Sequence, residues 1–236
     1  MIDDRNYFST CSLIDNVFII SGLIKDNLDW NDTATCFKFN TRSLKWKEIS
    51  NMINVRKLSA SSVFEGRIVV SGGWFNNRLN TVEAYDHVRN TWENMPNMIN
   101  VRFCHKSVAV KNKLFVVGGL STSNCEVFDS TTNKFTVLKQ PTLASRFNLR
   151  EPFGVITIGS KIFIFKDNLD VKTYDFEKNK WSLNACTATK NIRFFGSVKI
   201  PVMKNDKKTW SKKKREIFIL LFVLFFLTCI VLVFNR

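Results

Sequence analysis

Residues 67–94, RIVVSGGWFNNRLNTVEAYDHVRNTWEN, decide the fold of this chain. A β-branched apolar run ends in Gly72-Gly73, and an asparagine-rich loop follows it. A second run ends in Tyr85-Asp86, and a short turn then leads to a third run around Trp92. Short apolar runs separated by Gly, Asn and Asp turns are typical of antiparallel strands. Together with the weakly alternating residues 59–63, the stretch predicts a unit of three or four strands.

The unit recurs along the chain, and its clearest mark is an aromatic residue followed seven positions later by another. The pairs are Phe39 with Trp46, Tyr85 with Trp92, Phe128 with Phe135, and Tyr174 with Trp181. The second aromatics are separated by 46, 43 and 46 residues, a period typical of β-propellers and other repeat arrays. The connecting segment is repeated as well, because SNMINVR at 50–56 returns as PNMINVR at 96–102.

Each recurring residue type has a physical reason. We expect the Gly-Gly pair to end the innermost strand of each blade, where glycine permits positive φ and close approach. The continuous apolar run before it indicates a strand covered on both faces. The paired aromatics are expected to fill the space between adjacent blades. The Asp or Asn after the first aromatic suits a hairpin turn, since its side chain can accept hydrogen bonds from nearby backbone.

With its Gly-Gly, Tyr-Asp and Trp at these separations, the chain resembles the kelch repeat over residues 5–185, and among kelch proteins it is most similar to the kelch-like (BTB-kelch) group. The resemblance implies an all-β fold of kelch-type β-propeller blades. Four blades are expected at about 5–50, 51–96, 97–140 and 150–185, within a repeat region of 1–200. A fifth begins at 191 and breaks off at Pro201, which predicts an incomplete ring. The first and fourth units depart from the pattern, with Ser21-Gly22 and Phe165-Lys166 in place of Gly-Gly.

The C-terminal sequence has a different character. Residues 201–216 form a basic linker, and residues 217–234 contain no charge. A helix of that length spans about 27 Å, enough to cross a thin bilayer. The positive-inside rule then predicts a single-pass membrane protein with its repeats facing the cytosol. The expected membrane-surface residues are Lys207, Lys208, Lys212, Lys213, Lys214 and Arg215. The alternative is that this tail is a misread or alternative 3′ end that cuts the propeller.

The net charge of +15 is unevenly distributed. Nine Lys and Arg face two acidic residues from Lys199 onward, which leaves +8 for the first 198 residues. The densest basic cluster adjoins the apolar segment and suits anionic headgroups better than nucleic acid, so no nucleic-acid partner is expected. The six cysteines form no Cys-x-x-Cys pair, and the N-terminus has no apolar signal region. Reduced, buried thiols and a cytosolic repeat region are therefore expected.

No constellation of residues points to catalysis. The only histidines are His87 and His105, and no phosphate loop, Ser-His-Asp set or close carboxylate pair stands out. We therefore predict no catalytic residue, metal, cofactor or small-molecule substrate. A binding module needs only variable loops on a rigid scaffold. The spacing from the apolar strand to the next aromatic falls from 16 residues in the first unit to 8 in the fourth, so the loops vary where the framework does not.

The candidate partner-binding residues lie in those loops and at the start of each blade, as the resemblance to kelch-like proteins implies. The loop residues are Trp30, Trp74, Phe75, Asn77 and Arg78, and the blade-opening residues are Arg56, Lys57, Arg102, Phe103 and His105. Arg56 and Arg102 recur at one repeat position, which makes structural packing the stronger alternative for these two. Trp74 and Arg78 are the stronger candidates for contact, because Trp and Arg are enriched at interface hot spots.

The resemblance implies a protein partner, either a substrate of a cullin-based ubiquitin ligase or a cytoskeletal protein such as filamentous actin. In kelch-like relatives the adaptor role depends on an N-terminal BTB domain, whereas this chain begins inside the first repeat. We therefore expect substrate binding without delivery to cullin, and recovery of cullin with this chain alone would contradict that expectation. The alternative is a truncated isoform or gene fragment with no independent function.

Overall fold

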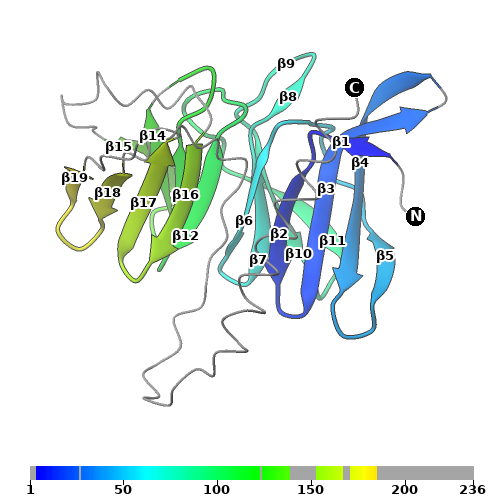
Figure 1. Cartoon of the computed structure of the whole chain (residues 1–236), viewed down its shortest axis with the longest axis horizontal. Coiled ribbons are helices and arrows are strands. Elements are labelled where there is room, and N and C mark those ends of the chain that lie inside the picture. The colour runs from blue at the N-terminus through cyan, green and yellow to red at the C-terminus, as the bar shows by residue number, and fades with distance from the viewer. Residues whose placement is uncertain (1–3, 27, 123, 139–152, 167–170, 185–236) are drawn as a thin grey trace, which may run out of the picture. The chain divides into compact units, whose positions relative to one another are not determined.

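The computed structural model describes residues 4–26, 28–122, 124–138, 153–166 and 171–184. All of them belong to the first of two compact units, Met1–Lys199, while the second unit is Ile200–Arg236. The described residues form four antiparallel sheets and one small hairpin (Figure 1). The predicted all-β architecture is confirmed in this part of the chain, where no helix occurs. Three of the sheets have four strands, and the first has five. The predicted start of a fifth blade at 191 lies outside the described residues.

The four sheets follow one another along the chain. The first contains β1 (Arg5–Asn6), β2 (Ser9–Leu13), β3 (Asn16–Asp26), β4 (Asp29–Asn40) and β5 (Lys45–Ile49). The second contains β6 (Ala60–Phe64), β7 (Arg67–Ser71), β10 (Val82–Asp86) and β11 (Thr91–Met95). The third contains β12 (Lys106–Val110), β13 (Lys113–Val117), β14 (Cys125–Asp129) and β15 (Lys134–Leu138). The fourth contains β16 (Phe153–Ile158), β17 (Lys161–Lys166), β18 (Val171–Asp175) and β19 (Lys180–Asn184). Strands β8 (Trp74–Phe75) and β9 (Asn77–Arg78) form the separate hairpin.

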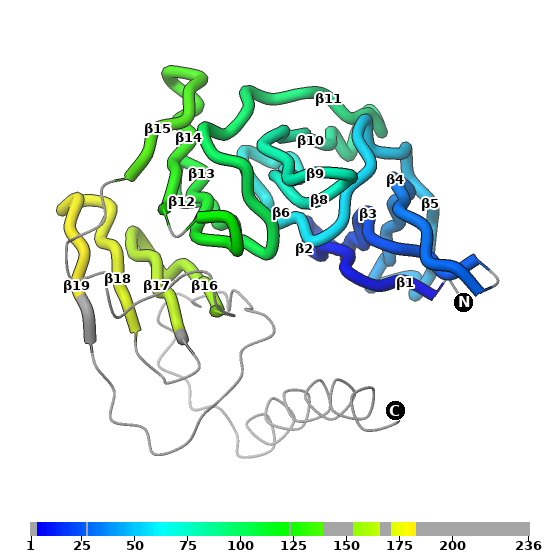
Figure 2. Tube along the Cα trace, turned by 90° about the horizontal axis from the view of Figure 1, so that it is seen from above, coloured from blue at the N-terminus to red at the C-terminus, as the bar shows by residue number. Residues whose placement is uncertain are grey.

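The strand that the Gly-Gly pair ends is the second of its sheet, so its prediction as the innermost strand was wrong. The sheet order places β6 before β7 and β12 before β13. Strands β2, β6, β12 and β16 contact one another in succession. Figure 2, a view from above, shows the four sheets one after another. The innermost strands carry small and polar residues, as in Ala60-Ser-Ser-Val-Phe64. Their weak alternation gave little sequence signal, whereas β7 and β13 are apolar at their centres because neighbouring sheets cover both of their faces.

The predicted role of the aromatic pairs is confirmed for the second, third and fourth sheets. The two members face each other across the third and fourth strands of every sheet, as in the register pairs Phe39 with Trp46 and Tyr85 with Trp92. Their ring centroids lie 4.9 to 5.1 Å apart in all four sheets, with tilted planes. The first ring of a pair also contacts an aromatic ring of the preceding sheet, for example Tyr85 with Phe18 at 6.1 Å. The pairs of the second, third and fourth sheets therefore fill interfaces between sheets, in offset arrangements that aromatic rings prefer. The pair of the first sheet, Phe39 with Trp46, packs on no other described sheet.

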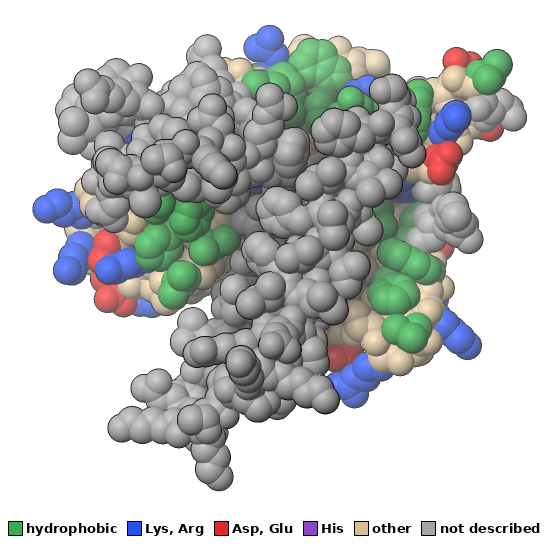
Figure 3. Space-filling model, viewed as in Figure 1, with side chains coloured by type: hydrophobic (Ala, Val, Ile, Leu, Met, Phe, Trp, Pro, Cys, Tyr) green, Lys and Arg blue, Asp and Glu red, His purple; other side chains and the backbone are tan. Residues whose placement is uncertain are grey.

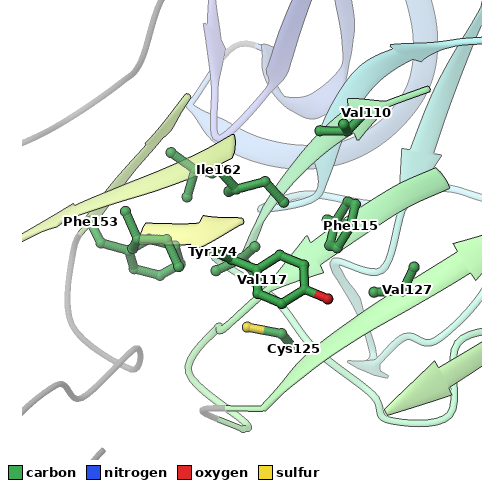
Figure 4. Packing of buried hydrophobic residues seen from close by; sticks show 10 residues of the cluster. Val110, Phe115, Val117, Cys125, Val127, Phe153, Ile162 and Tyr174 are labelled. Atoms are coloured by element: carbon green, nitrogen blue, oxygen red, sulfur yellow. The ribbon is translucent and has the colours of Figure 1, made fainter. Parts of the chain in front are cut away.

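Three apolar clusters join the four sheets in pairs. Phe18 and Ile20 of the first sheet pack with Ile68 and Tyr85 of the second. The second and third sheets share a similar cluster. Figure 4 shows the third cluster, in which Phe115 and Val117 of the third sheet meet Phe153, Ile162 and Tyr174 of the fourth. One face of each sheet thus packs on the opposite face of the next, as in a propeller.

The hairpin turns confirm the expectation for Asp or Asn after the first aromatic. The Asp86 carboxylate accepts hydrogen bonds from the backbone N–H groups of Val88 and Arg89, at 2.8 and 3.1 Å. Asn40 and Asp175 accept the corresponding bonds in the first and fourth sheets. These side-chain oxygens satisfy backbone N–H groups of the turn, which no longer pair with a neighbouring strand.

The four described cysteines are free, as predicted, but they are not all buried. Cys36 and Cys125 are buried, Cys11 is half-buried, and Cys104 is exposed. Burial raises the pKa of the Cys11 and Cys36 thiols to about 12. At neutral pH these two are protonated and behave as small apolar side chains.

Candidate functional site: the linker face

The inter-sheet linkers and two hairpins lie together on one face of the sheets, which we call the linker face. It comprises residues 56–59 and 102–104 of the linkers, the end of the β3–β4 hairpin, and the β8–β9 hairpin. The loop predicted after β3 is a strand extension, because β3 and β4 stay paired as far as Asp26 with Asp29. The loop after β7 likewise contains the β8–β9 hairpin, with Trp74 opposite Arg78. Figure 1 shows both hairpins on the same side of the sheets.

Three predicted binding residues, Lys57, Trp74 and Phe103, form a continuous row on this face. Lys57 pairs with Trp74 through two backbone hydrogen bonds, of 3.0 Å from its N–H and 2.8 Å to its carbonyl. Its ammonium group lies 3.1 Å from a carboxylate oxygen of Asp32 on β4. The Trp74 ring meets the Phe103 ring edge to face, with centroids 5.2 Å apart. The row therefore connects β4, the first linker, the β8–β9 hairpin and the second linker.

The tip of the β8–β9 hairpin extends from this row. Phe75 is 38% exposed, and Asn77 and Arg78 are also exposed. Trp30, on the β3–β4 hairpin, is 40% exposed, and it lies on the same face of β4 as Asp32 because side chains alternate along a strand. These four residues therefore present polar and aromatic surface to solvent on the linker face.

Sequence reasoning missed three exposed apolar residues beside the linker face: Tyr7, Phe8 and Leu120. Tyr7 accepts a hydrogen bond from the Leu58 N–H, and Leu58 in turn accepts one from the Cys104 N–H. Tyr7, Leu58 and Cys104 all adopt positive φ, between 54° and 56°. They occupy the same repeat position, two residues after an arginine, and this spacing from Arg5, Arg56 and Arg102 was the available signal.

The structure buries Arg56 and Arg102 completely, which removes both from the predicted contact surface and supports the packing alternative. The Arg102 guanidinium donates to the carbonyls of Gly118 and Asn124, at 2.7 and 2.8 Å, and pairs with the Glu126 carboxylate. Arg56 makes the equivalent bonds in the second sheet. An arginine is favoured here because its planar fork satisfies several acceptors at once.

Glu83 and Glu126, which the sequence reasoning did not single out, complete these networks. Glu126 accepts hydrogen bonds from the backbone N–H groups of Ile99 and Asn100, at 2.7 and 3.0 Å, and from the Asn100 amide at 2.8 Å. Glu83 does the same for the preceding linker. Each carboxylate therefore fixes the repeated Ile-Asn-Val-Arg linker on the sheet that follows. Both residues stand two positions before the first aromatic, which was a visible repeat.

The linkers are also attached to the preceding sheets. Gly22 of the first sheet donates its N–H to the Arg56 carbonyl at 3.0 Å, and Gly73 of the second donates to the Arg102 carbonyl at 2.8 Å. The side chain of each arginine thus donates hydrogen bonds to the sheet that follows, and its backbone carbonyl accepts one from the sheet that precedes. The linker face is therefore a rigid surface built from paired backbone.

The first and fourth sheets lack the glutamate. The first has Phe37 at that position, and the Arg5 guanidinium lies 5.2 Å from its ring centroid while also donating to the Ser21 and Thr35 carbonyls. The fourth has Lys172, a buried lysine whose ammonium lies 4.7 Å from the Trp181 ring centroid. Burial lowers the pKa of Lys172. Cation–π contacts thus occur where the second and third sheets use ion pairs.

His105, the last blade-opening candidate, is buried below the linker face and cannot contact a partner. Its Nε2 lies 2.8 Å from the Ser71 Oγ of the neighbouring sheet, and its Nδ1 has no hydrogen-bond partner. Burial lowers the pKa of His105 well below its usual value, and the nearby Arg102, Lys106 and Arg56 lower it further. The imidazole is therefore neutral at physiological pH and joins the second and third sheets.

This neutral histidine makes stability depend on pH. The unfolded chain binds a proton at His105 below about pH 6.5, whereas the folded chain does not, so acid favours unfolding. We expect the free energy of unfolding to fall by about 1.4 kcal/mol per pH unit below that point. The slope should flatten in His105→Gln and persist in His87→Gln, measured by urea denaturation between pH 7.5 and 5.5. Equal slopes in wild type and His105→Gln would contradict this account.

The predicted membrane-surface residues, Lys207 to Arg215, and the predicted transmembrane helix, 217–234, lie outside the described residues. Within the described ranges, no helix is long and apolar enough to cross a membrane. In the same part of the chain, no group of three or more His, Cys, Asp or Glu residues could hold a metal ion.

Antiparallel sheets that pack face to face, with their innermost strands in contact in succession, are typical of the β-propeller class of protein. In this protein the linkers and two short hairpins form a surface on one side of the sheets. Residues 56–99 and 102–142 match the kelch motif, and each match begins at one of the two buried arginines. These two segments therefore resemble kelch repeats. A search of curated proteins gave no significant match. Among solved structures, the chain is similar to the one titled "Structure of YjhT", with a TM-score of 0.63 and 15% identity. The similarity covers 79% of this chain and 67% of that one, and it supports the fold.

Proposed function

We propose that this chain is a non-catalytic protein-interaction module that binds a protein partner on its linker face. Kelch repeats generally mediate protein–protein binding. The observation that carries the proposal is the fixed pair of rings, Trp74 and Phe103, flanked by the exposed side chains of Phe75 and Arg78. Aromatic and arginine side chains on a rigid base are the residue types that dominate interface hot spots. Little ordering entropy is then lost on binding, because backbone pairing already fixes the hairpin.

The partner class is either a ubiquitin-ligase substrate or a cytoskeletal protein, and we further propose that residues 217–234 tether the chain to a membrane. A tethered module would act where its partner meets the membrane surface. Flotation of the full-length chain with lipid vesicles tests the tether, and a chain that stays at the bottom of the gradient would refute it. Co-sedimentation with filamentous actin tests the cytoskeletal class directly.

A crosslinking experiment locates the binding surface. A photo-crosslinking amino acid placed at position 75 of the full-length chain in cells should capture a protein that the same group at position 88, in the β10–β11 turn, does not. The double variant Phe75→Ala/Arg78→Ala should then weaken binding of that protein by at least about tenfold, a change of about 1.4 kcal/mol. Neither side chain is buried, so the variant is expected to stay folded.

The β10–β11 turn offers a matched control. Val88 and Arg89 are also an apolar residue and an arginine near the tip of a hairpin, and both are about 80% exposed. Val88→Ala/Arg89→Ala should therefore leave binding unchanged. If the two double variants weaken binding equally, or if both crosslinking positions capture the same protein, the linker face is not the binding surface.

A further inference from the structure

Two turns of the first sheet carry exposed aliphatic residues in a backbone conformation that such residues rarely adopt. Ile14, in the β2–β3 turn, is 74% exposed with φ of 55°. Leu44, in the β4–β5 turn, is 71% exposed with φ of 56°. A positive φ is uncommon for residues other than glycine, asparagine and aspartate, and for a β-branched residue such as Ile14 it is a clear outlier. Packing explains neither residue, because neither side chain is buried.

The other three sheets place polar residues or glycine at the same turn positions. The position of Leu44 is asparagine in each of them: Asn90, Asn133 and Asn179. The position of Ile14 is polar or glycine: Glu65, Lys111 and Gly159. All six residues also have positive φ. The first sheet therefore departs from the repeat in favour of two strained, exposed aliphatic residues, and such a departure at the surface points to a function.

The two turns lie side by side at one end of the first sheet. The Thr41 N–H donates a hydrogen bond to the Asp15 carbonyl at 2.8 Å, and the Arg42 Nε lies 2.9 Å from an Asp15 carboxylate oxygen. Strand β3 runs from these turns to the β3–β4 hairpin of the linker face, a distance of roughly 30 Å at the usual rise per residue. Ile14 and Leu44 therefore stand at the end of the sheet opposite to the linker face, as Figure 1 shows for their turns.

Basic side chains surround the two aliphatic residues. The segments that form the two turns, 14–16 and 38–47, contain four cations: Lys38, Arg42, Lys45 and Lys47. Their one carboxylate is that of Asp15, which is paired with Arg42. Glu48 follows in the sequence, but it lies on the opposite face of β5 from Lys47. Figure 3 shows hydrophobic and basic side chains together at the lower right, over these turns.

The lysines of this region lack acidic partners. Among the described residues, none forms an ion pair with Lys45 or Lys47, and both side chains are exposed. Lys38 and Lys47 are register partners, and like charges directly opposite each other destabilise a sheet. An anion bound beside them would relieve that repulsion. The two turns therefore combine protruding aliphatic groups with positive charge that the sheet itself does not neutralise.

We propose that this end of the first sheet docks on a membrane surface that carries anionic headgroups. Ile14 and Leu44 insert among the lipids, while Arg42, Lys45 and Lys47 contact the phosphates; these five residues are the tip patch. Buried apolar area and attraction to anionic lipids are the two contributions that hold a protein at such a surface.

The shape of the tip patch favours a bilayer over a protein as its partner. A specific protein interface buries about 800 Å² on each side around a packed apolar centre. Ile14 and Leu44 instead project singly from two turns, which suits insertion into a fluid surface. Trp46, 44% exposed on β5, is a residue type enriched where a membrane meets water. Docking by this end directs the linker face away from the membrane, and it depends neither on the proposed function nor on a tether at 217–234.

Quenching of a fluorescent amino acid by spin-labelled lipids tests the docking. The label replaces Ser43 of the full-length chain, an exposed residue beside Leu44. It should lose most of its fluorescence on phosphatidylcholine vesicles that contain about one-quarter phosphatidylserine, and keep it on phosphatidylcholine alone, because the cations require anionic headgroups. A tether would hold the chain on both kinds of vesicle, so it cannot produce this difference. A label that is not quenched, or that is quenched equally without phosphatidylserine, would overturn the proposal.

The double variant Ile14→Asn/Leu44→Asn separates docking from folding. Asparagine suits a positive φ, so the variant should unfold at the same temperature as the unsubstituted chain or at a higher one. Quenching of the label at position 43 should nevertheless be lost, because the inserted aliphatic groups are gone. A stable variant that is still quenched would show that Ile14 and Leu44 do not reach the lipids, and the proposal would fail.

A second pair of variants tests the contribution of charge. Lys45→Gln/Lys47→Gln should abolish the quenching that phosphatidylserine causes. The matched control is Lys178→Gln/Lys180→Gln, which removes two exposed lysines from the β18–β19 turn of the fourth sheet and should leave the quenching unchanged. Equal losses in the two double variants would mean that total charge, rather than the tip patch, attracts the chain to the vesicles, and this outcome also contradicts the proposal.

Discussion

Replacing Glu126 with glutamine is expected to lower the free energy of unfolding by about 3–5 kcal/mol, the loss typical of breaking a buried ion pair from one side. Glutamine has nearly the same shape and can still accept hydrogen bonds from the linker. It leaves the Arg102 guanidinium, however, as a fully buried charge without its carboxylate. Urea denaturation of the full-length chain at neutral pH measures the change.

The exposed pair of Lys111 and Glu177 provides the control. Their charged atoms lie 3.2 Å apart, and both side chains are more than half exposed. Glu177→Gln is the same substitution at an exposed position. It should lower the free energy of unfolding by at most about 1 kcal/mol, because water screens the pair. Similar losses in the two variants would mean that the buried network contributes no more than a surface ion pair.

Replacing Gly73 with alanine is expected to cost about 3 kcal/mol or more, from backbone strain combined with a steric clash. Gly73 has φ of 105°, and a Cβ there would lie 2.7 Å from the Lys57 carbonyl oxygen. Relief of the clash would separate Lys57 from Trp74 and so distort the linker face. We therefore expect Gly73→Ala to lower both the midpoint of thermal unfolding and the affinity for the crosslinked partner.

Gly66 separates the steric effect from the effect of φ. It lies in the β6–β7 turn with φ of 74°, and an added Cβ would meet no atom within 4 Å. Gly66→Ala should therefore cost only the backbone penalty of about 1–2 kcal/mol and leave binding unchanged. If the two alanine variants were equally stable, contact with the linker would not be the reason for glycine at position 73.

The periodic residues predicted most of the fold. The aromatic pairs and the Asp or Asn of each turn act through local geometry that all four units repeat, and Gly-Gly recurs in two of them, so their spacing identified the units. The order of strands was not predictable in the same way. An innermost strand such as Ala60–Phe64 is defined by its neighbours from other sheets, and its small, polar residues carry only a weak local signal.

The candidate site was predictable in part. The aromatic residues Trp74 and Phe103 are half-buried, and the row that they form with Lys57 includes three residues chosen from the sequence. Arg56, Arg102 and His105 were harder to place, because a charged or titratable residue in a linker usually faces water. Their burial depends on distant acceptors, such as Glu126 for Arg102, which no short window of sequence contains.

The double attachment of the linkers bears on how the chain acquires its structure during synthesis. The Gly22 N–H bonds to the carbonyl of Arg56, and the Gly73 N–H bonds to that of Arg102. A ribosome at about 5–20 residues per second must therefore extend the chain for several seconds past each glycine before its partner emerges. A nascent blade can form these bonds only after the following linker has been synthesised. Native structure is therefore expected to form about one repeat later than synthesis of the blade itself. A translational pause within a linker would delay folding of the blade before it.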